Sequence, residues 1–130
     1  MFLDNYYYYF QKALTAEFCD KIIETGKSKI VEKAKIHDES LKARDSSIAW
    51  MEEEWLYKNI EPFIQEANKR AGWNFDWERS ESCQFTKYKL NQYYDWHCDS
   101  WDKPYEKEGP DNGKIRKLSM TCQLTDGFLI

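Results

Sequence analysis

Hydrophobic residues recur at helical spacing in two stretches of the first half of the chain. In the first stretch, Phe18 and Ile22 share one face of a helix that Thr15 would cap at its amino end. Gly26 is the kind of residue at which helices stop, so we expect this helix to end there. The charged residues 27–45 are expected to form a solvated connection that has room for one further strand segment.

The second helical pattern spans residues 52–71. Pro62 lies inside it and lacks the backbone N–H that a helix interior needs, so the pattern predicts a kinked helix or two consecutive helices. Gly72 is expected to end this helical part of the chain. The apolar side of the pattern consists of Trp55, Leu56, Ile60, Phe63, Ile64 and Ala67.

Beyond Gly72 the spacing of hydrophobic residues changes from helical to alternating, which is typical of strands. Residues 100–114 interrupt this pattern with two prolines and an Asp-Asn-Gly turn, and they predict a long irregular loop. Loops of that length are often functional lids. The strands that we expect, including two short ones in the first half, lie at residues 6–9, 46–50, 73–77, 83–88 and 118–124.

Composition indicates one folded domain of 130 residues, with 42% hydrophobic and 17% aromatic residues. The net charge of −4 disfavours binding to nucleic acid. No signal peptide and no apolar run of membrane-spanning length is found, so no membrane partner is expected. The four cysteines form no CxxC pair and are expected to be reduced packing residues, which predicts a cytoplasmic location.

One pair of residues has the chemistry of a metal site. In a strand, His97 and Asp99 would project from the same face, and the intervening Cys98 would point away and pack. One imidazole, one carboxylate and a second imidazole on one octahedral face is the arrangement of non-haem iron(II) oxygenases. Because 23 of the 130 residues are acidic, the pair alone favours a simpler interpretation, a histidine hydrogen-bonded to a neighbouring carboxylate.

A longer stretch around the pair carries a resemblance to a known family. Residues 83–101, CQFTKYKLNQYYDWHCDSW, and residues 116–126, RKLSMTCQLTD, resemble the 2-oxoglutarate/Fe(II) oxygenases of the prolyl 4-hydroxylase type. They look closest to the small bacterial and phage members, which would place a phage-encoded chain in the host cytoplasm. Residues 44–50 and 66–73 fit the helical amino-terminal part of the same group.

The resemblance implies a mainly β fold with N-terminal helices, a partial double-stranded β-helix (a cupin-like jelly roll). Residues 1–72 would be the helical part, and residues 73–130 the first strands of the jelly roll, within one domain. The implied activity couples decarboxylation of 2-oxoglutarate to hydroxylation of a small molecule or a protein side chain. The cofactors would be Fe(II), 2-oxoglutarate and O2, with ascorbate as an optional reductant.

The resemblance also assigns roles to individual residues. His97 and Asp99 would bind iron, and Tyr88 and Gln123 would contact 2-oxoglutarate. Trp101 and the loop after it would cover the substrate. Ser119 and Thr121 would line the same cavity, with Thr121 facing the substrate. The alternative interpretations are a half-buried core tyrosine for Tyr88, a packing residue for Trp101, and solvent-facing polar residues for Ser119, Thr121 and Gln123.

The chain departs from the family pattern after Asp99. The family needs a distal histidine and then an arginine or lysine for 2-oxoglutarate, and none of the 31 residues after Asp99 is a histidine. The other histidine, His37, is expected to be a solvated surface residue. We therefore expect a carboxy-terminally truncated oxygenase that binds iron and 2-oxoglutarate poorly and is weakly active or inactive, with open sheet edges that favour self-association.

Three other functions stay open from the sequence. The first is a non-catalytic binding or scaffold domain on a degenerate oxygenase fold. The second is structural zinc held by His97, Cys98, Cys83 and Cys122, although closely spaced cysteine pairs are missing. The third is a single-stranded nucleic-acid binder that stacks bases on its aromatic residues, which the acidic balance disfavours.

Overall fold

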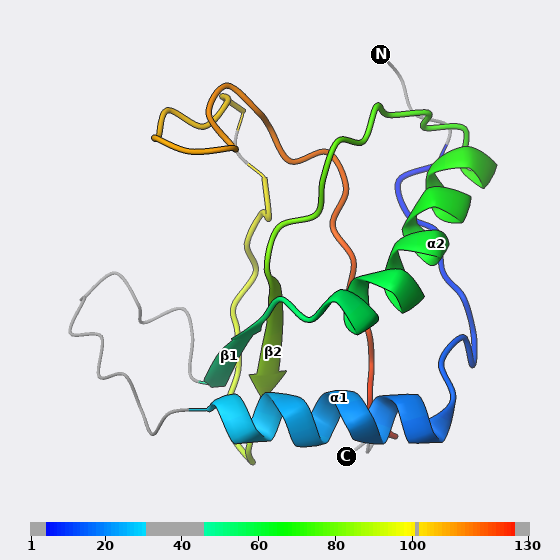
Figure 1. Cartoon of the computed structure of the whole chain (residues 1–130), viewed down its shortest axis with the longest axis vertical. Helices are drawn as coiled ribbons and strands as arrows, with labels where there is room; N and C mark the ends of the chain where they lie inside the picture. Colours follow the sequence, from blue (N-terminus) through cyan, green and yellow to red (C-terminus); the bar gives the residue numbers. More distant parts are fainter. Residues whose placement is uncertain (1–4, 31–45, 101, 127–130) are drawn as a thin grey trace.

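The computed structural model describes residues 5–30, 46–100 and 102–126. Its elements follow in the order α1 (Ala16–Lys29), β1 (Ser47–Met51), α2 (Glu54–Arg70) and β2 (Cys83–Lys87). Figure 1 shows α1 crossing beneath the two strands and α2 inclined to one side of them. Neither helix in these described ranges is long and apolar enough to cross a membrane.

The two strands form one antiparallel sheet, in which Ala49 lies opposite Phe85 and Trp50 opposite Gln84. Ala49 and Phe85 are buried, whereas Trp50 is 56% exposed, so one face of the sheet turns inward and the other outward. This alternation is what strand geometry requires of a sheet with one covered face. The expected strands at 46–50 and 83–88 are therefore confirmed to within a residue.

The hydrophobic core lies where the sheet meets the two helices. Six buried residues form it: Ile22, Ala49, Met51, Leu56, Ile60 and Phe85. Helix α1 begins as expected, because the Thr15 side chain accepts a hydrogen bond of 3.2 Å from the Phe18 amide. Leu124, far along the chain, packs against the same core and returns the last described segment to it.

One expectation about the helices is wrong, and one of two alternatives is excluded. Helix α1 continues through Gly26 to Lys29, because the missing side chain serves packing rather than termination. A Cβ at Gly26 would lie 2.3 Å from Cγ of Phe85, so the glycine lets α1 approach β2 closely. Helix α2 is one helix that contains Pro62, so two consecutive helices do not form, and Leu56 and Ile60 on its apolar side are buried. Its expected end is confirmed by Gly72, which adopts a φ of +72°.

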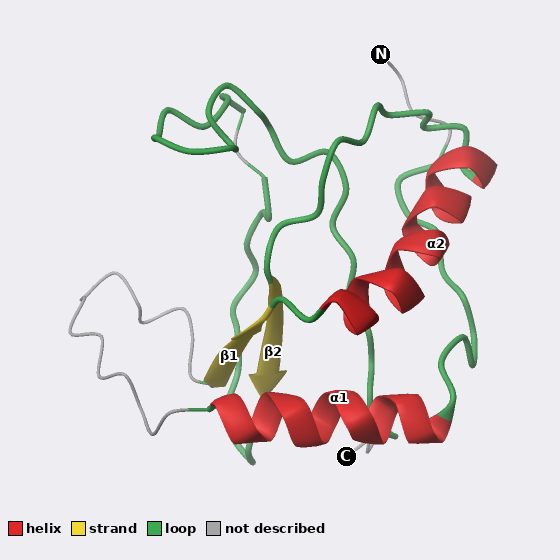
Figure 2. Ribbon diagram, in the orientation of Figure 1, coloured by secondary structure: helices red, strands yellow, loops and turns green. Residues whose placement is uncertain are grey.

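The mainly β fold and the partial jelly roll are wrong for the described residues. Two helices and a two-stranded sheet are the regular elements there, and Figure 2 shows long loops in place of further strands. Residues 6–9, 73–77 and 118–124 form no strands, so alternation alone was not sufficient. The irregular loop expected after residue 100 is confirmed in its described part, residues 102–114.

Hydrogen bonds to helix α2 explain why residues 73–77 do not form the expected strand. The Asn68 side chain accepts a 3.0 Å hydrogen bond from the Phe75 amide and donates a 2.9 Å bond to the Phe75 carbonyl. The Asn68 carbonyl accepts from the amides of Trp73 and Asn74. One residue of the helix thus satisfies backbone groups that a neighbouring strand would otherwise have to satisfy.

The aromatic residues before α1 also lie along α2. The Trp73 indole N–H donates to the Asn5 carbonyl at 2.5 Å, and the Phe10 ring meets Phe63 edge-on at a centroid distance of 5.2 Å. Between these two attachments Tyr6 and Tyr7 stay largely exposed, at 81% and 77%. Side-chain contacts with a helix, and not pairing with a strand, therefore fix this segment.

Candidate metal site

The structure brings His97 and Asp99 together. His97 Nε2 lies 3.1 Å from Oδ1 of Asp99, and the two side chains are 37% and 49% exposed. Residues 95–100 form bends rather than a strand, so the closeness that strand geometry predicted arises from a bent backbone. Cys98, expected to pack inside, is exposed. The pair therefore lies on the surface, beyond the end of β2.

The His97 ring is held from two directions. Its Nδ1 lies 2.8 Å from the carbonyl oxygen of Asp95, which can only accept, so Nδ1 carries a proton. The Tyr94 ring stacks on the imidazole with a centroid distance of 3.6 Å and an interplanar angle of 19°. In the neutral ring this tautomer leaves a lone pair on Nε2, on the side of Asp99. This is how proteins orient a histidine that binds a metal.

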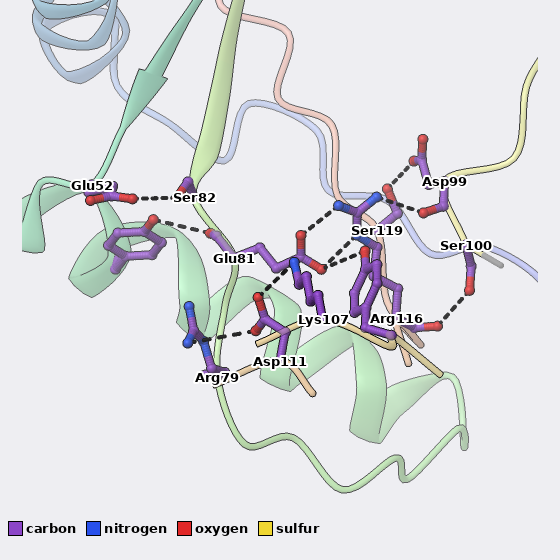
Figure 3. A network of polar contacts seen from close by, with 12 residues as sticks. Glu52, Arg79, Glu81, Ser82, Asp99, Ser100, Lys107, Asp111, Arg116 and Ser119 are labelled. Atoms are coloured by element: carbon purple, nitrogen blue, oxygen red, sulfur yellow. Dashed lines mark hydrogen bonds and ion pairs between the residues drawn. The ribbon is translucent and has the colours of Figure 1, made fainter. Parts of the chain in front are cut away.

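Asp99 is held through both its backbone and its side chain (Figure 3). Arg116 Nη1 donates to the Asp99 carbonyl oxygen at 2.8 Å. The Ser119 hydroxyl donates to Oδ2 of Asp99, which leaves Oδ1 facing His97. Ser100 Oγ donates to the Arg116 carbonyl at 2.9 Å and joins the same two segments a second time. Ser119, predicted to line a cavity, is exposed and contacts Asp99 directly.

Glu81 holds the arginine that contacts Asp99. Its two carboxylate oxygens accept from Nε and Nη2 of Arg116 at 2.7 Å and 2.5 Å, a bidentate ion pair. Tyr105 adds a 3.3 Å bond from its hydroxyl to the same carboxylate. Hydrogen bonding to Arg116 lowers the pKa of Glu81 below its ordinary value of 4.5 and raises that of Arg116. The charged forms of both residues are therefore favoured.

The loop before Arg116 closes on itself and so returns the chain to Asp99. The Tyr105 amide donates to the Lys114 carbonyl at 2.8 Å, and the Gly113 amide donates to the Tyr105 carbonyl at 2.9 Å. Gly113 has a φ of +75°, a conformation that favours glycine at this turn. The turn is therefore what places residue 116 beside residue 99.

Other residues with predicted roles do not join the pair. Tyr88 follows β2 with 48% of its surface exposed. Gln123 donates to the Thr125 carbonyl at 3.1 Å, and Thr121 is exposed. In the described ranges, the hydrogen bonds and ring contacts of His97 and Asp99 involve none of these three. Trp101 lies outside the described residues.

In the described part of the chain, metal-binding side chains form no cluster larger than a pair. Among residues 5–30, 46–100 and 102–126, no group of three or more histidine, cysteine, aspartate or glutamate side chains is arranged to hold a metal ion. The zinc set considered from sequence, His97 with Cys83, Cys98 and Cys122, is therefore not assembled. His37 lies outside the described residues.

Two shallow hollows in the surface lie elsewhere. The first, about 440 Å³ in volume, is lined by Tyr57, Arg79, two serines and three glutamates. The second, about 680 Å³, follows the tyrosines at residues 6–9. Neither includes His97 or Asp99 in its lining, and both of these residues are exposed. Trp96, next to His97 in the chain, is fully exposed.

Sequence reasoning missed the support from Glu81 and Arg116. Arg116 stood inside the segment that carries the family resemblance, but no spacing rule links it to a glutamate 35 positions earlier. Only the folded chain brings the two together. Comparison of the chain with protein-family models, with curated proteins and with solved structures finds no match.

Proposed function

We propose that His97 and Asp99 are two ligands of a ferrous ion, in a 2-oxoglutarate-dependent oxygenase that hydroxylates a small molecule or a protein side chain. The observation that carries the proposal is the 3.1 Å distance between Nε2 of His97 and Oδ1 of Asp99. Two ligand atoms in adjacent octahedral positions, each about 2.1 Å from a metal, are about 3.0 Å apart. The pair fits that requirement.

The donor chemistry fits as well. Nδ1 of His97 bonds to a carbonyl, so the neutral ring offers Nε2 as a ligand atom. Ser119 occupies one oxygen of Asp99, which favours binding through the other oxygen. A bound ferrous ion would supply activation of O2 coupled to the decarboxylation of 2-oxoglutarate. The protein residues orient the two ligands, while Tyr94 covers one face of the imidazole.

The proposal rests on this pair and not on a jelly-roll fold. Two protein ligands are fewer than the three of the non-haem iron arrangement, so we expect weak metal binding by this chain, with water or 2-oxoglutarate filling other positions. Tyr88 and Gln123 remain the residues proposed to contact 2-oxoglutarate, and Trp101 and Thr121 those proposed to face the substrate.

Calorimetric titration of the anaerobic protein with Fe(II) tests the proposal. We expect one ion to bind per chain, and we expect His97→Ala and Asp99→Asn each to weaken binding at least tenfold. Asp102→Asn, an exposed acid three residues further on, is the matched control and should bind like wild type. Tight binding that His97→Ala leaves unchanged would rule out the pair as the iron site.

Activity is a separate measurement. With Fe(II), ascorbate and 2-oxoglutarate under air, the proposed oxygenase releases succinate in step with 2-oxoglutarate consumption, and His97→Ala abolishes that release. Iron binding without any succinate would leave a metal site but remove the oxygenase assignment.

A non-catalytic binding domain is the second candidate function. The same 3.1 Å contact is an ordinary distance for an ion pair between a protonated histidine and an aspartate, and both side chains are partly exposed. In that function His97 and Asp99 would be part of a docking surface. The titration separates the two candidates, because a docking surface needs no ferrous ion.

A further inference from the structure

The guanidinium group of Arg116 contacts both Glu81 and the candidate ligand Asp99. Nε and Nη2 of Arg116 bind the two oxygens of Glu81, and Nη1 binds the Asp99 carbonyl oxygen at 2.8 Å. All three nitrogens of the side chain are therefore engaged. This needs the planar fork of arginine, which a lysine ammonium group does not provide.

Glu81 in turn is attached to helix α2. The Tyr57 hydroxyl lies 3.1 Å from the Glu81 carbonyl and 3.3 Å from that of Met51, the last residue of β1. Burial raises the pKa of Tyr57 to about 12, so its hydroxyl stays protonated and able to donate. A chain of polar contacts thus leads from the core through Glu81 and Arg116 to Asp99.

The position of Asp99 depends on this chain, because hydrophobic packing does not reach it. The described residues from 95 to 100 are all exposed, and the apolar side chain among them, Trp96, is fully exposed. Segments with few buried contacts open locally at low free-energy cost. The backbone bond from Arg116 and the side-chain bond from Ser119 are the contacts that connect Asp99 to residues distant in sequence.

We infer that Arg116, fixed by Glu81, is a positioning residue that sets the orientation of the Asp99 carboxylate toward His97 and thereby the affinity of the site for a divalent ion. The inference rests on the proposed function, because it takes His97 and Asp99 to be metal ligands. Arg116 touches neither the metal nor a substrate, and it acts through the backbone of Asp99.

The first variant to test is Arg116→Lys, which keeps the positive charge but loses the bidentate fork and the third bond. Loss of a residue that orients a metal ligand typically weakens metal binding 10–100-fold, and we expect that range for Mn(II) measured by electron paramagnetic resonance. Arg79→Lys is the matched control, because Arg79 also pairs with an acid, Asp111 at 3.6 Å, without touching Asp99. The control should bind Mn(II) like wild type.

A charge-swapped double variant, Glu81→Arg with Arg116→Glu, separates positioning from simple stability. It restores attraction between the two segments, but a carboxylate at position 116 cannot donate to the Asp99 carbonyl. We expect the double variant to recover stability relative to Arg116→Glu alone, while its Mn(II) affinity stays at least tenfold below wild type. Mn(II) binding restored to the wild-type value by the swap would overturn the inference.

Backbone order parameters from NMR relaxation of the metal-free protein give a readout that does not depend on metal binding. Arg116→Lys should lower the order parameters of residues 97–100 and leave those of helices α1 and α2 unchanged. Wild-type Mn(II) binding that Arg116→Lys does not weaken overturns the inference and leaves the proposed function standing. If wild type binds neither Mn(II) nor Fe(II), the proposed function fails, and unchanged order parameters at 97–100 would show separately that Arg116 does not order Asp99.

Discussion

The sheet with its two helices and the surface segment of residues 95–100 are held in shape by different forces. In the first region, Met51 is 1% exposed and the other core residues are almost as deeply buried. In the second, the long-range connections of Asp99 are hydrogen bonds between exposed groups. Apolar burial stabilises a region in proportion to area and without strict geometry, whereas each polar bond fixes one direction.

This difference explains why the candidate site lies where it does. Metal ligands need fixed orientation and access to solvent, which a buried apolar core does not offer. The polar region offers both, but its order depends on a few contacts around Glu81 and Arg116. We therefore expect the two regions to respond differently to substitution, with core changes acting on global unfolding and site changes on local order.

The largest expected effect is that of Phe85→Ala. Phe85 is 8% exposed and lies against α1 at Gly26, so its removal leaves a cavity between the helix and the sheet. Truncation of a buried phenylalanine costs about 3–5 kcal/mol, a large part of the stability of a small domain. Denaturant unfolding followed by circular dichroism measures the loss.

Trp50→Ala is the control for this substitution. Trp50 is an aromatic residue of the same sheet, opposite Gln84, but it is 56% exposed on the outer face. We expect a clearly smaller loss for Trp50→Ala. Equal losses for the two variants would mean that the inner face is not the main source of stability.

A smaller loss of stability is expected from Gly26→Ala, which adds volume to the core instead of removing it. The added methyl group would lie 2.3 Å from Cγ of Phe85, and overpacking of this kind costs about 1–3 kcal/mol. The substitution is informative because alanine is otherwise the better helix former by about 1 kcal/mol. Lys27→Ala, at the exposed neighbouring position, should be close to neutral by the same unfolding measurement. A Gly26→Ala variant more stable than wild type would contradict the close helix–sheet approach.

Much of the first region could be predicted from sequence, because its patterns have local causes. The Thr15 cap, the two helices and the two paired strands follow from hydrophobic spacing and from turn residues. Gly26 was misinterpreted because a glycine that permits close packing looks the same in sequence as one that ends a helix. The cause lies in Phe85, about sixty positions away.

The rest of the described chain, outside the sheet and its two helices, could be predicted only in part. The proximity of His97 and Asp99 follows from their spacing, although a bend and not a strand produces it. The expected strand at 73–77 did not form. A strand needs a neighbouring strand to bond its backbone, and here the Asn68 side chain bonds the backbone of Phe75 instead. The contacts of Glu81 with Arg116 connect distant segments through charge, and charged residues are too frequent in this chain for sequence to select one pair.

The smallest expected effect concerns pH and sharpens the contrast between the regions. The folded pKa of Glu81 is lowered by Arg116, and that of Glu53, at the start of α2, is lowered by Lys29 at the end of α1. A carboxyl whose pKa is lower in the folded state stabilises the protein fully above its unfolded value of about 4.5. That contribution is lost as the pH falls through the folded pKa, so acid should weaken both contacts.

The part of the protein that is destabilised should differ between substitution of Glu81 and substitution of Glu53. Glu81→Gln should lower the NMR backbone order parameters of residues 97–100 at neutral pH, and its difference from wild type should shrink as the pH falls below about 4.5. Glu53→Gln should act instead on global unfolding, because the Lys29 contact links α1 to α2. Both effects are small, since these ion pairs are partly exposed. If Glu81→Gln changed global unfolding as much as Glu53→Gln and left residues 97–100 unaffected, the polar region would not be a separate unit, because its order would come from the core.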